Sequence, residues 1–256
     1  MSRNGARLTR RGGLGKTRLA IGSVVVAWLT SCAMAGLSAA PVLDETVGFS
    51  ARFLPLRPIQ AGGDTPGNFD FYVLALSWSA GFCETQARGR FEGGQCAAGA
   101  NQSFVVHGLW PQNEHGYPSN CGAFPRNPPR TALDAVRGLY PSESLARHEW
   151  QVHGTCSGQS PTNYFADVRR ALDQVTIPPS FTAPSEPQSL APLDIARAFI
   201  AANPRLRPGM LGVTCKDGVL QEVRICLSKD LRDFHACPEV VRQGCRLPEI
   251  SVPPPL

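Results

Sequence analysis

Acidic side chains are missing from the first 43 positions of the 256-residue chain, where Asp44 is the first to occur. Basic side chains are concentrated in the same stretch, since six of the 25 arginines and lysines lie within the first 18 residues. The rest of the chain carries 19 basic and 20 acidic residues, a net charge of −1, whereas the whole sequence has +5. The formal basicity therefore belongs to the N-terminus, and binding of nucleic acid through general positive charge is excluded for the remainder.

Several familiar motifs are also missing. The chain has no glycine-rich phosphate loop, no GxSxG sequence and no HExxH sequence, which excludes the common nucleotide-binding, serine hydrolase and zinc protease sites. No two cysteines are two to four residues apart, so a structural zinc site is disfavoured. Charged residues make up only 18% and hydrophobic residues 43%, which indicates a globular chain and excludes a disordered one.

Residues 1–40 resemble an export signal, with a basic start, an apolar run at 19–29 and small residues after it. The uncharged stretch 19–43 is long enough to span a membrane, but serines and glycines dilute it. Residues 29–32 (LTSC) are similar to a bacterial lipoprotein signal, in which Cys32 is acylated; conventional cleavage after residue 35 or 40 is the alternative. Both interpretations predict a secreted or periplasmic protein, and 22 arginines against three lysines favour a bacterial source.

The cysteine count agrees with export. Of the nine cysteines, Cys32 lies in the predicted leader, and the remaining eight form an even set. An even set in an exported chain predicts four disulfides, although the count alone does not determine which cysteines pair.

Residues 41–68 are rich in Gly, Pro and Ala without periodicity, which predicts a linker or loosely packed arm before a domain over 69–256. Apolar runs predict strands at 69–78 and at 103–109, the second ending at Gly108. A hairpin is expected from strands at 211–216 and 219–228 joined by Asp217-Gly218.

Helices are predicted at 131–139 with Thr131 as N-cap, at 142–153 with Ser142 as N-cap, at 162–174 and at 192–202. A proline-rich loop is expected over 178–192, and the C-terminal tail is expected to be irregular. Because strands and helices do not alternate regularly, the sequence predicts an α+β fold whose central, mainly antiparallel sheet is flanked by helices and stapled by disulfides.

Histidines are few, and three of the five are candidates for one site. His107 lies at the end of an apolar strand, while His148, Glu149 and His153 lie within one predicted helix, where they share a broad face. Two imidazoles beside a carboxylate suit general acid–base chemistry near neutral pH. Without a dedicated nucleophile, such a set suits a substrate that supplies its own, as RNA does through its 2′-hydroxyl.

Two segments carry a resemblance to a known family. FVVHGLWP (104–111) and HEWQVHGTC (148–156) resemble the two active-site blocks of the ribonuclease T2 family, and the similarity extends over residues 69–245. The resemblance implies that His107 and His153 are the acid–base pair, with His153 favoured as base and His107 as acid. It assigns His148 to phosphate binding, Glu149 to support of the charged transition state, and Trp110 to stacking on a base.

The resemblance also implies the pairings Cys83–Cys96, Cys121–Cys156, Cys215–Cys245 and Cys226–Cys237. Base preference is expected to depend on the pocket around Trp110, Gln112 and Tyr117.

One position departs from the family, which usually has lysine immediately before the last histidine of the second block, where this chain has Val152. Because an ammonium there stabilises developing negative charge, its absence predicts an active but slower enzyme, in which Val152→Lys raises turnover.

The sequence thus predicts an endoribonuclease that cleaves single-stranded RNA by metal-independent transesterification through a 2′,3′-cyclic phosphate. It is expected to need no cofactor, to leave DNA intact, to have no stable protein partner and to be a monomer. A catalytically impaired family member that acts as an RNA-binding or cytotoxic interaction module is the alternative. A zinc hydrolase using His148, His153 and Cys156 is disfavoured, because the resemblance gives Cys156 a disulfide partner.

Overall fold

The most apolar run of the sequence forms the central strand of the fold. Every residue of strand β1 (Phe71–Trp78) is buried, as expected for a strand covered on both faces. The computed structural model describes residues 64–86, 94–122 and 124–256. The predicted export signal, the acylation site Cys32 and most of the predicted arm lie outside the described residues.

Strand β1 belongs to a six-stranded sheet with the order β2-β1-β5-β6-β3, in which β4 also pairs with β5. The pairs are antiparallel except for the short parallel contact between β5 and β6. The predicted α+β fold with a mainly antiparallel sheet is confirmed. Besides β1, the strands are β2 (Phe104–Gln112), β3 (Gln188–Leu190), β4 (Leu211–Lys216), β5 (Val219–Ser228) and β6 (Ile250–Val252).

The described helices comprise six α-helices and three short 3₁₀ segments. The α-helices are α1 (Ser79–Gln86), α2 (Arg130–Asp134), α3 (Glu143–Val152), α4 (Pro161–Asp173), α5 (Pro192–Ala202) and α6 (Pro238–Arg242). The 3₁₀ segments are η1 (Gly94–Cys96), η2 (Gly154–Ser157) and η3 (Pro179–Phe181).

Elements with strong local signals lie where the sequence places them. The β4–β5 hairpin turns at Asp217 and Gly218, whose φ angles of 51° and 78° match the primed turn that an Asp-Gly pair favours. Ser142 caps α3 by accepting a hydrogen bond from the backbone N–H of Leu145.

Other expectations are wrong. Helix α2 has Pro129, not Thr131, at its N-cap, and it ends at Asp134, before Gly138, whose φ of 83° does not continue a helix. Helices α1 and α6 were not predicted, since neither has a long amphipathic repeat. The expected loop over 178–192 contains η3 and β3, and the expected irregular tail contains β6.

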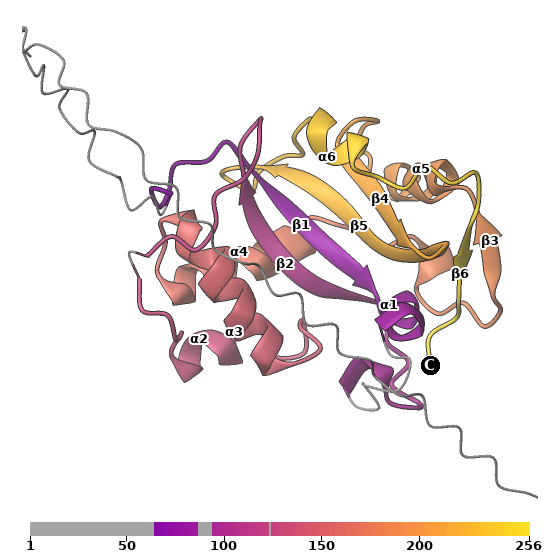
Figure 1. Ribbon diagram of the computed structural model, residues 1–256, viewed down its shortest axis with the longest axis horizontal. Helices are drawn as coiled ribbons and strands as arrows, with labels where there is room; N and C mark the ends of the chain where they lie inside the picture. Colours follow the sequence, from indigo (N-terminus) through magenta and orange to yellow (C-terminus); the bar gives the residue numbers. More distant parts are fainter. Residues whose placement is uncertain (1–63, 87–93, 123) are drawn as a thin grey trace, which may run out of the picture. The chain divides into compact units, whose positions relative to one another are not determined.

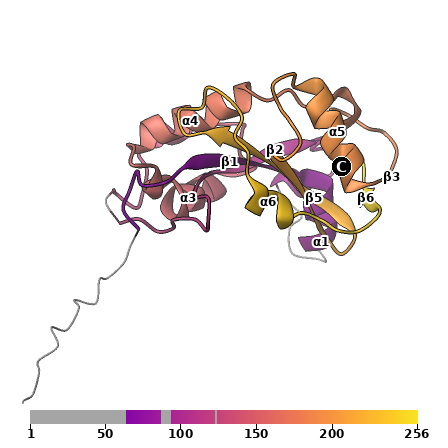
Figure 2. The same ribbon diagram turned by 90° about the horizontal axis from the view of Figure 1, so that it is seen from above.

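Helices cover both faces of the sheet. Figure 1 shows α2, α3 and α4 on the β2 side and α5 near β3, and Figure 2 shows α4 and α5 above the sheet and α6 below it. The main core lies between the sheet and α4 and α5, with Trp78, Phe165 and Phe199 among its largest members. A smaller cluster of Phe71, Val73, Cys226, Cys237 and Val240 lies under α6.

Four disulfides connect the cysteines of the domain. Cys83–Cys96, Cys121–Cys156, Cys215–Cys245 and Cys226–Cys237 are bonded, as the family resemblance implies. Cys121–Cys156 joins η2, directly after α3, to the loop that follows β2. Within the part of the chain that the structure describes, no helix is long and apolar enough to cross a membrane.

Candidate active site

A β-bulge in β2 projects His107 from the sheet. Gly108 pairs with Ala75 of β1 and Val106 pairs with Leu76, so His107 is the extra residue between them. A bulge re-aims its side chain relative to the regular alternation of a strand. The expectation that the strand ends at Gly108 is wrong, because β2 continues to Gln112 and places Trp110 and Gln112 beyond the bulge.

Two charged residues of β5 reach the same part of the sheet. Glu222 pairs with Ser77 and Arg224 with Ala75, so both side chains lie on one face of β5, two residues apart. The Glu222 carboxylate accepts a hydrogen bond from Nδ1 of His107 at 2.5 Å. Its other oxygen accepts from Nε of Arg224 at 2.8 Å. Glu222 thus links the His107 imidazole to the Arg224 guanidinium.

Helix α3 contributes a second buried carboxylate. Glu149 is only 2% exposed, and its Oε2 accepts a hydrogen bond from the indole N–H of Trp110 at 2.7 Å. Its Oε1 lies 3.6 Å from Nε2 of His107. A Cβ added to Gly108 would overlap both Glu149 and Trp110, so this close approach of α3 to β2 requires glycine at that position.

His153 lies at the end of α3, where it is the C-cap residue. Its ring centroid is 5.3 Å from that of Trp110, and the His107 centroid is 5.2 Å from that of Trp110, with the two rings nearly perpendicular. Nδ1 of His153 is buried without a hydrogen-bond partner among the described residues, which leaves Nε2 as the nitrogen available to a ligand. His148, one turn earlier, is exposed on α3.

The carboxylates give His107 an electrostatic environment that favours its charged form. Burial acts to lower the pKa of His107, but the hydrogen bond and charge of Glu222, with the charge of Glu149, outweigh burial and raise that pKa above its usual value. Burial likewise acts to raise the pKa of Glu222, but His107 and Arg224 outweigh it and lower that pKa. Burial raises the pKa of Glu149.

His153 has the opposite environment. Burial, aided by the positive charges of His107 and His148, lowers the pKa of His153 to about 4. The two imidazoles therefore differ in protonation over a range of pH, with His153 neutral while His107 is charged. Paired groups whose environments push their pKa values apart are typical of acid–base catalysts.

A pocket of about 270 Å³ lies beside this cluster. All three residues predicted to bind the base line it, together with His153 and Arg224. The lining residues are Val73, Trp110, Gln112, Tyr117, His153, Arg224, Val240 and Gln243. Tyr117 is 61% exposed, so its ring is accessible to a ligand.

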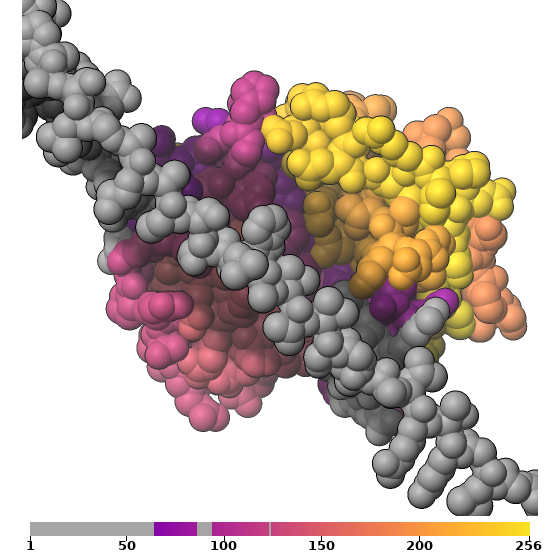
Figure 3. Space-filling model, viewed as in Figure 1, coloured from indigo at the N-terminus to yellow at the C-terminus, as the bar shows by residue number. Residues whose placement is uncertain are grey.

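The loop 113–117 that carries Tyr117 is held against α6. Glu239 of α6 accepts a hydrogen bond from the backbone N–H of Gly116 at 3.3 Å and lies 3.7 Å from His115. Glu114 is 3.0 Å from Nε2 of His235. In Figure 3 the magenta tip of this part of the chain lies against the yellow C-terminal segment that contains α6.

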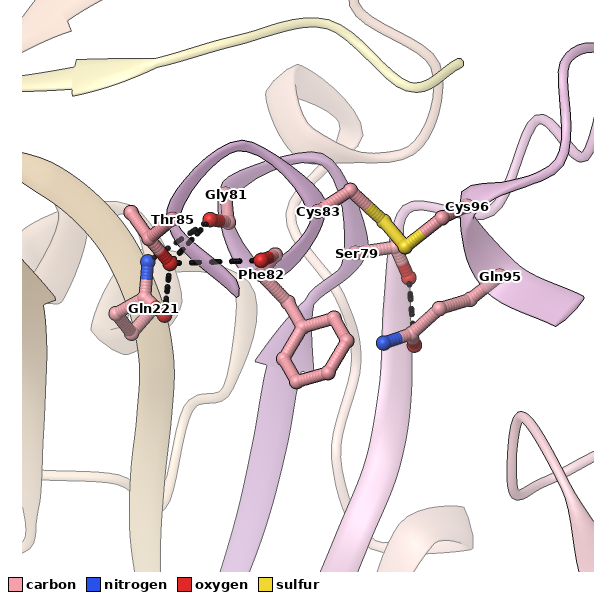
Figure 4. Close-up of a disulfide and its surroundings, with 8 residues drawn as sticks. All are labelled: Ser79, Gly81, Phe82, Cys83, Thr85, Gln95, Cys96 and Gln221. Atoms are coloured by element: carbon pink, nitrogen blue, oxygen red, sulfur yellow. Dashed lines mark hydrogen bonds between the residues drawn. A yellow bond between two sulfur atoms is a disulfide. The ribbon is translucent and has the colours of Figure 1, made fainter. Parts of the chain in front are cut away.

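A second pocket of about 470 Å³ lies on the other side of His107, and the sequence reasoning did not find it. His107 and Glu222 belong to its wall, and its other lining residues include Phe82, Gln95, Val105, Pro141, Ser142, Leu145 and Gln221. Figure 4 shows the Phe82 ring between Gln221 and Gln95. The Cys83–Cys96 disulfide and the 3.1 Å hydrogen bond from Thr85 to Gln221 tie this wall together.

Glu222 and Arg224 are the site residues that sequence reasoning missed. Their signal is a pair of charged side chains two positions apart in a mostly apolar strand, at 222 and 224 of VLQEVRICLS. Apart from each other, their partners are His107 and Trp110, which lie more than 110 residues earlier in the chain, so the pattern alone does not say what they contact. No group of three or more metal-ligating side chains is found within the described residues.

Comparisons with known proteins show what the chain is similar to in sequence. The model of the Ribonuclease T2 family matches residues 69–237. A ribonuclease from Aeromonas hydrophila is 35% identical over 199 residues, which cover 76% of this chain and 87% of that protein. Ribonuclease DdI from Dictyostelium discoideum is 28% identical over 202 residues, which cover 70% of this chain and 83% of that protein.

Solved structures share the fold. An RNase-related protein from Calystegia sepium superimposes with a TM-score of 0.59 at 21% identity, covering 73% of this chain and 98% of that one. The structure of RNase NT in complex with 5′-AMP gives a TM-score of 0.54 at 23% identity, covering 73% and 99%. The helix-flanked sheet described above is therefore the fold of these two proteins.

Proposed function

Because the chain belongs to the ribonuclease T2 family, we propose that it is an endoribonuclease that cleaves single-stranded RNA by metal-independent transesterification. The observation that carries this mechanism is the contrast between the two imidazoles. His107 has both Glu222 and Glu149 within 4 Å, whereas His153, half-buried beside the Trp110 ring, pairs with no carboxylate among the described residues.

In the proposed reaction, neutral His153 takes the proton of the 2′-hydroxyl through Nε2. The 2′-oxygen attacks the adjacent phosphorus, and the bond from phosphorus to the 5′-oxygen breaks. Protonated His107 gives its Nε2 proton to the departing 5′-oxygen, while Glu222 holds the opposite nitrogen, Nδ1. The products are a 2′,3′-cyclic phosphate and a free 5′-hydroxyl. DNA lacks the attacking hydroxyl and is not a substrate.

The remaining site residues have supporting roles in this proposal. His148, exposed on α3 where its charge acts on Glu149 and His153, binds phosphate, and Glu149 holds the Trp110 indole and faces the His107 imidazole. The pockets on the two sides of His107 accommodate the nucleosides on either side of the scissile phosphate. Trp110, Gln112 and Tyr117 line the first of these pockets and contact its base.

The mechanism requires His153 unprotonated and His107 protonated at the same time. Activity therefore rises as the pH increases through the pKa of His153, which burial lowers to about 4. It falls as the pH increases through the pKa of His107, which the two carboxylates raise. The expected profile is a bell with its acidic limb near pH 4.

Export is the second part of the proposal. Four disulfides within one small domain suit an oxidising compartment, which agrees with a leader over residues 1–40. We propose a secreted or periplasmic enzyme, and intact-mass measurement of the mature protein decides whether Cys32 is acylated.

One assay tests the activity. Purified protein is incubated with single-stranded RNA and with DNA of the same sequence, with and without EDTA, and compared with His107→Ala and His153→Ala. Cleavage of RNA alone that survives EDTA and is lost in either variant is the expected result. RNA binding without cleavage in the wild type would instead select the impaired, RNA-binding module, whose support is Val152. Cleavage of DNA, or loss of activity in EDTA, would contradict the mechanism.

A further inference from the structure

The two pockets near His107, which together form the proposed RNA-binding cleft, have few permanently charged cationic side chains. Among the described residues that line the two pockets, Arg224 is the only arginine or lysine. Val152, where the family usually has lysine, is a half-buried aliphatic residue at the last position of α3. Glu222 also lines the second pocket, and the Glu149 carboxyl group lies against Trp110 and His107. Without Arg224, the phosphate of bound RNA would meet two carboxyl groups and one protonated imidazole there.

Arg224 is held in place from two directions. Its Nε and Nη2 atoms each lie 2.8 Å from Oε2 of Glu222, and its Cζ atom lies 5.2 Å from the centroid of the Trp110 ring. These contacts engage one edge of the guanidinium, and no hydrogen bond from the described residues occupies the N–H groups of Nη1, which a ligand could use. The side chain is 27% exposed and lines the same pocket as His153.

We propose that Arg224 is the cation that contacts the scissile phosphate of RNA and that it replaces, from β5, the family lysine missing at position 152. The inference rests on the proposed ribonuclease function. A guanidinium already fixed by Glu222 and Trp110 needs little reorganisation when negative charge develops on the phosphate, which is the condition under which such a group accelerates a reaction most. Arg224 then largely compensates for the slower turnover that is expected when Val152 replaces the family lysine.

A purely structural role for Arg224, as the partner of Glu222, is the competing explanation, and a double-mutant cycle separates the two. The variants are Arg224→Gln, Val152→Lys and the combination, with kcat and KM measured on a short single-stranded RNA at each variant's optimal pH. Val152 lies on α3, one turn after His148, so a lysine there restores a cation to the cleft without repairing a lost contact on β5.

We expect Arg224→Gln to lower kcat about 100-fold, as loss of one transition-state cation does. Val152→Lys should change kcat less than about threefold in the wild type but raise it at least about tenfold in the Arg224→Gln background. Arg147→Gln is the matched control, because Arg147 also pairs through Nε and Nη2 with a carboxylate, Glu143, but outside the cleft. Its kcat should stay within about twofold of the wild type.

An Arg224→Gln variant with kcat within about threefold of the wild type would overturn the proposal. The proposal would also be overturned if Arg224→Gln lowered kcat strongly and Val152→Lys did not restore it, provided that thermal unfolding shows both variants to be folded. If Arg224→Gln does not fold, Arg224→Lys provides the test, since it keeps the charge and should retain kcat within about tenfold. A wild type that leaves RNA intact refutes the proposed function itself, and the cycle distinguishes that result from failure of the role of Arg224 alone.

Discussion

His107 and His153 differ in the carboxylates that surround them, although both rings contact the same indole. Glu222 and Glu149 face His107 from two elements, β5 and α3, and stabilise its imidazolium form. His153 is half-buried, and the charged groups that act on it are His107 and His148, so its neutral form is favoured. Acid and base are thus distinguished by neighbours that lie far apart in the sequence.

Glu222→Gln tests this distinction. Glutamine can still accept the hydrogen bond from Nδ1 of His107, but it removes the negative charge that raises the pKa of His107. Because cleavage requires His107 protonated, the alkaline limb of the kcat–pH profile should move to lower pH, while the acidic limb, set by His153, moves little. Glu249→Gln, at an exposed carboxylate that accepts a hydrogen bond from Ser189, is the matched control. An unmoved alkaline limb would show that Glu222 does not tune His107.

Gly108→Ala tests the contact between α3 and β2. The added methyl group would overlap the Glu149 carboxylate and the Trp110 indole, so their hydrogen bond must open or the helix must shift. Overpacking of this kind typically costs about 1–3 kcal/mol of unfolding free energy. We expect a loss of kcat of at least about tenfold from the displaced site. Gly122→Ala, where a Cβ meets nothing within 4 Å, should change neither urea unfolding nor kcat. Normal turnover in Gly108→Ala would mean that the Glu149–Trp110 contact is dispensable.

At the scale of elements, the sequence predicts what depends on local patterns. The Ser142 cap, the Asp217-Gly218 turn and the apolar run of β1 are each determined by neighbouring residues, and all three lie where expected. The bulge at His107 depends on the register between β2 and β1, which a single strand does not encode. The short helices α1 and α6 are likewise stabilised by packing and disulfides more than by their own sequences.

The site residues likewise divide into those that local motifs predict and those that only the tertiary structure reveals. His107, His148, Glu149 and His153 were predicted because short motifs contain them, and Trp110, Gln112 and Tyr117 line one pocket as expected. The arginine and glutamate of β5 were missed, because only the pairing of β5 with β1 brings them near β2. The second pocket was missed because its walls come from five separated parts of the chain.

The disulfide Cys121–Cys156 allows a test at this scale, since it connects the end of the α3–η2 segment to the loop after β2. Replacing both cysteines by alanine should lower the unfolding free energy by about 4 kcal/mol in the chain-entropy model, for a sequence separation of 35. Cys83→Ala with Cys96→Ala opens a separation of only 13 and should cost about 3 kcal/mol. Urea unfolding of both double variants measures the difference. A greater loss for the shorter loop would contradict the entropic argument.

At the scale of the whole molecule, charge provides little long-range attraction for RNA. After the basic first 18 residues the chain carries 19 basic and 20 acidic side chains, so a phosphate backbone meets a surface close to neutral. Binding must then come from local contacts, of which Arg224 and His148 are the candidate phosphate partners. One or two phosphate contacts release few counterions, in contrast with a basic groove that follows the backbone over many nucleotides.

The salt dependence of RNA binding measures the number of these phosphate contacts directly. For one or two contacts on a single strand, the dissociation constant of a 2′-O-methyl oligonucleotide, which has no 2′-hydroxyl to attack, should rise only about three- to sevenfold between 50 and 200 mM salt. A dinucleotide should show nearly the same dependence as a twelve-nucleotide strand, because phosphates beyond the cleft add no fixed contacts. A much steeper dependence for the longer strand would reveal a basic path outside the two pockets. If instead the dependence is shallow for both and becomes shallower in Arg224→Gln, the electrostatic part of RNA binding resides in the cleft, where the same arginine acts on the reacting phosphate.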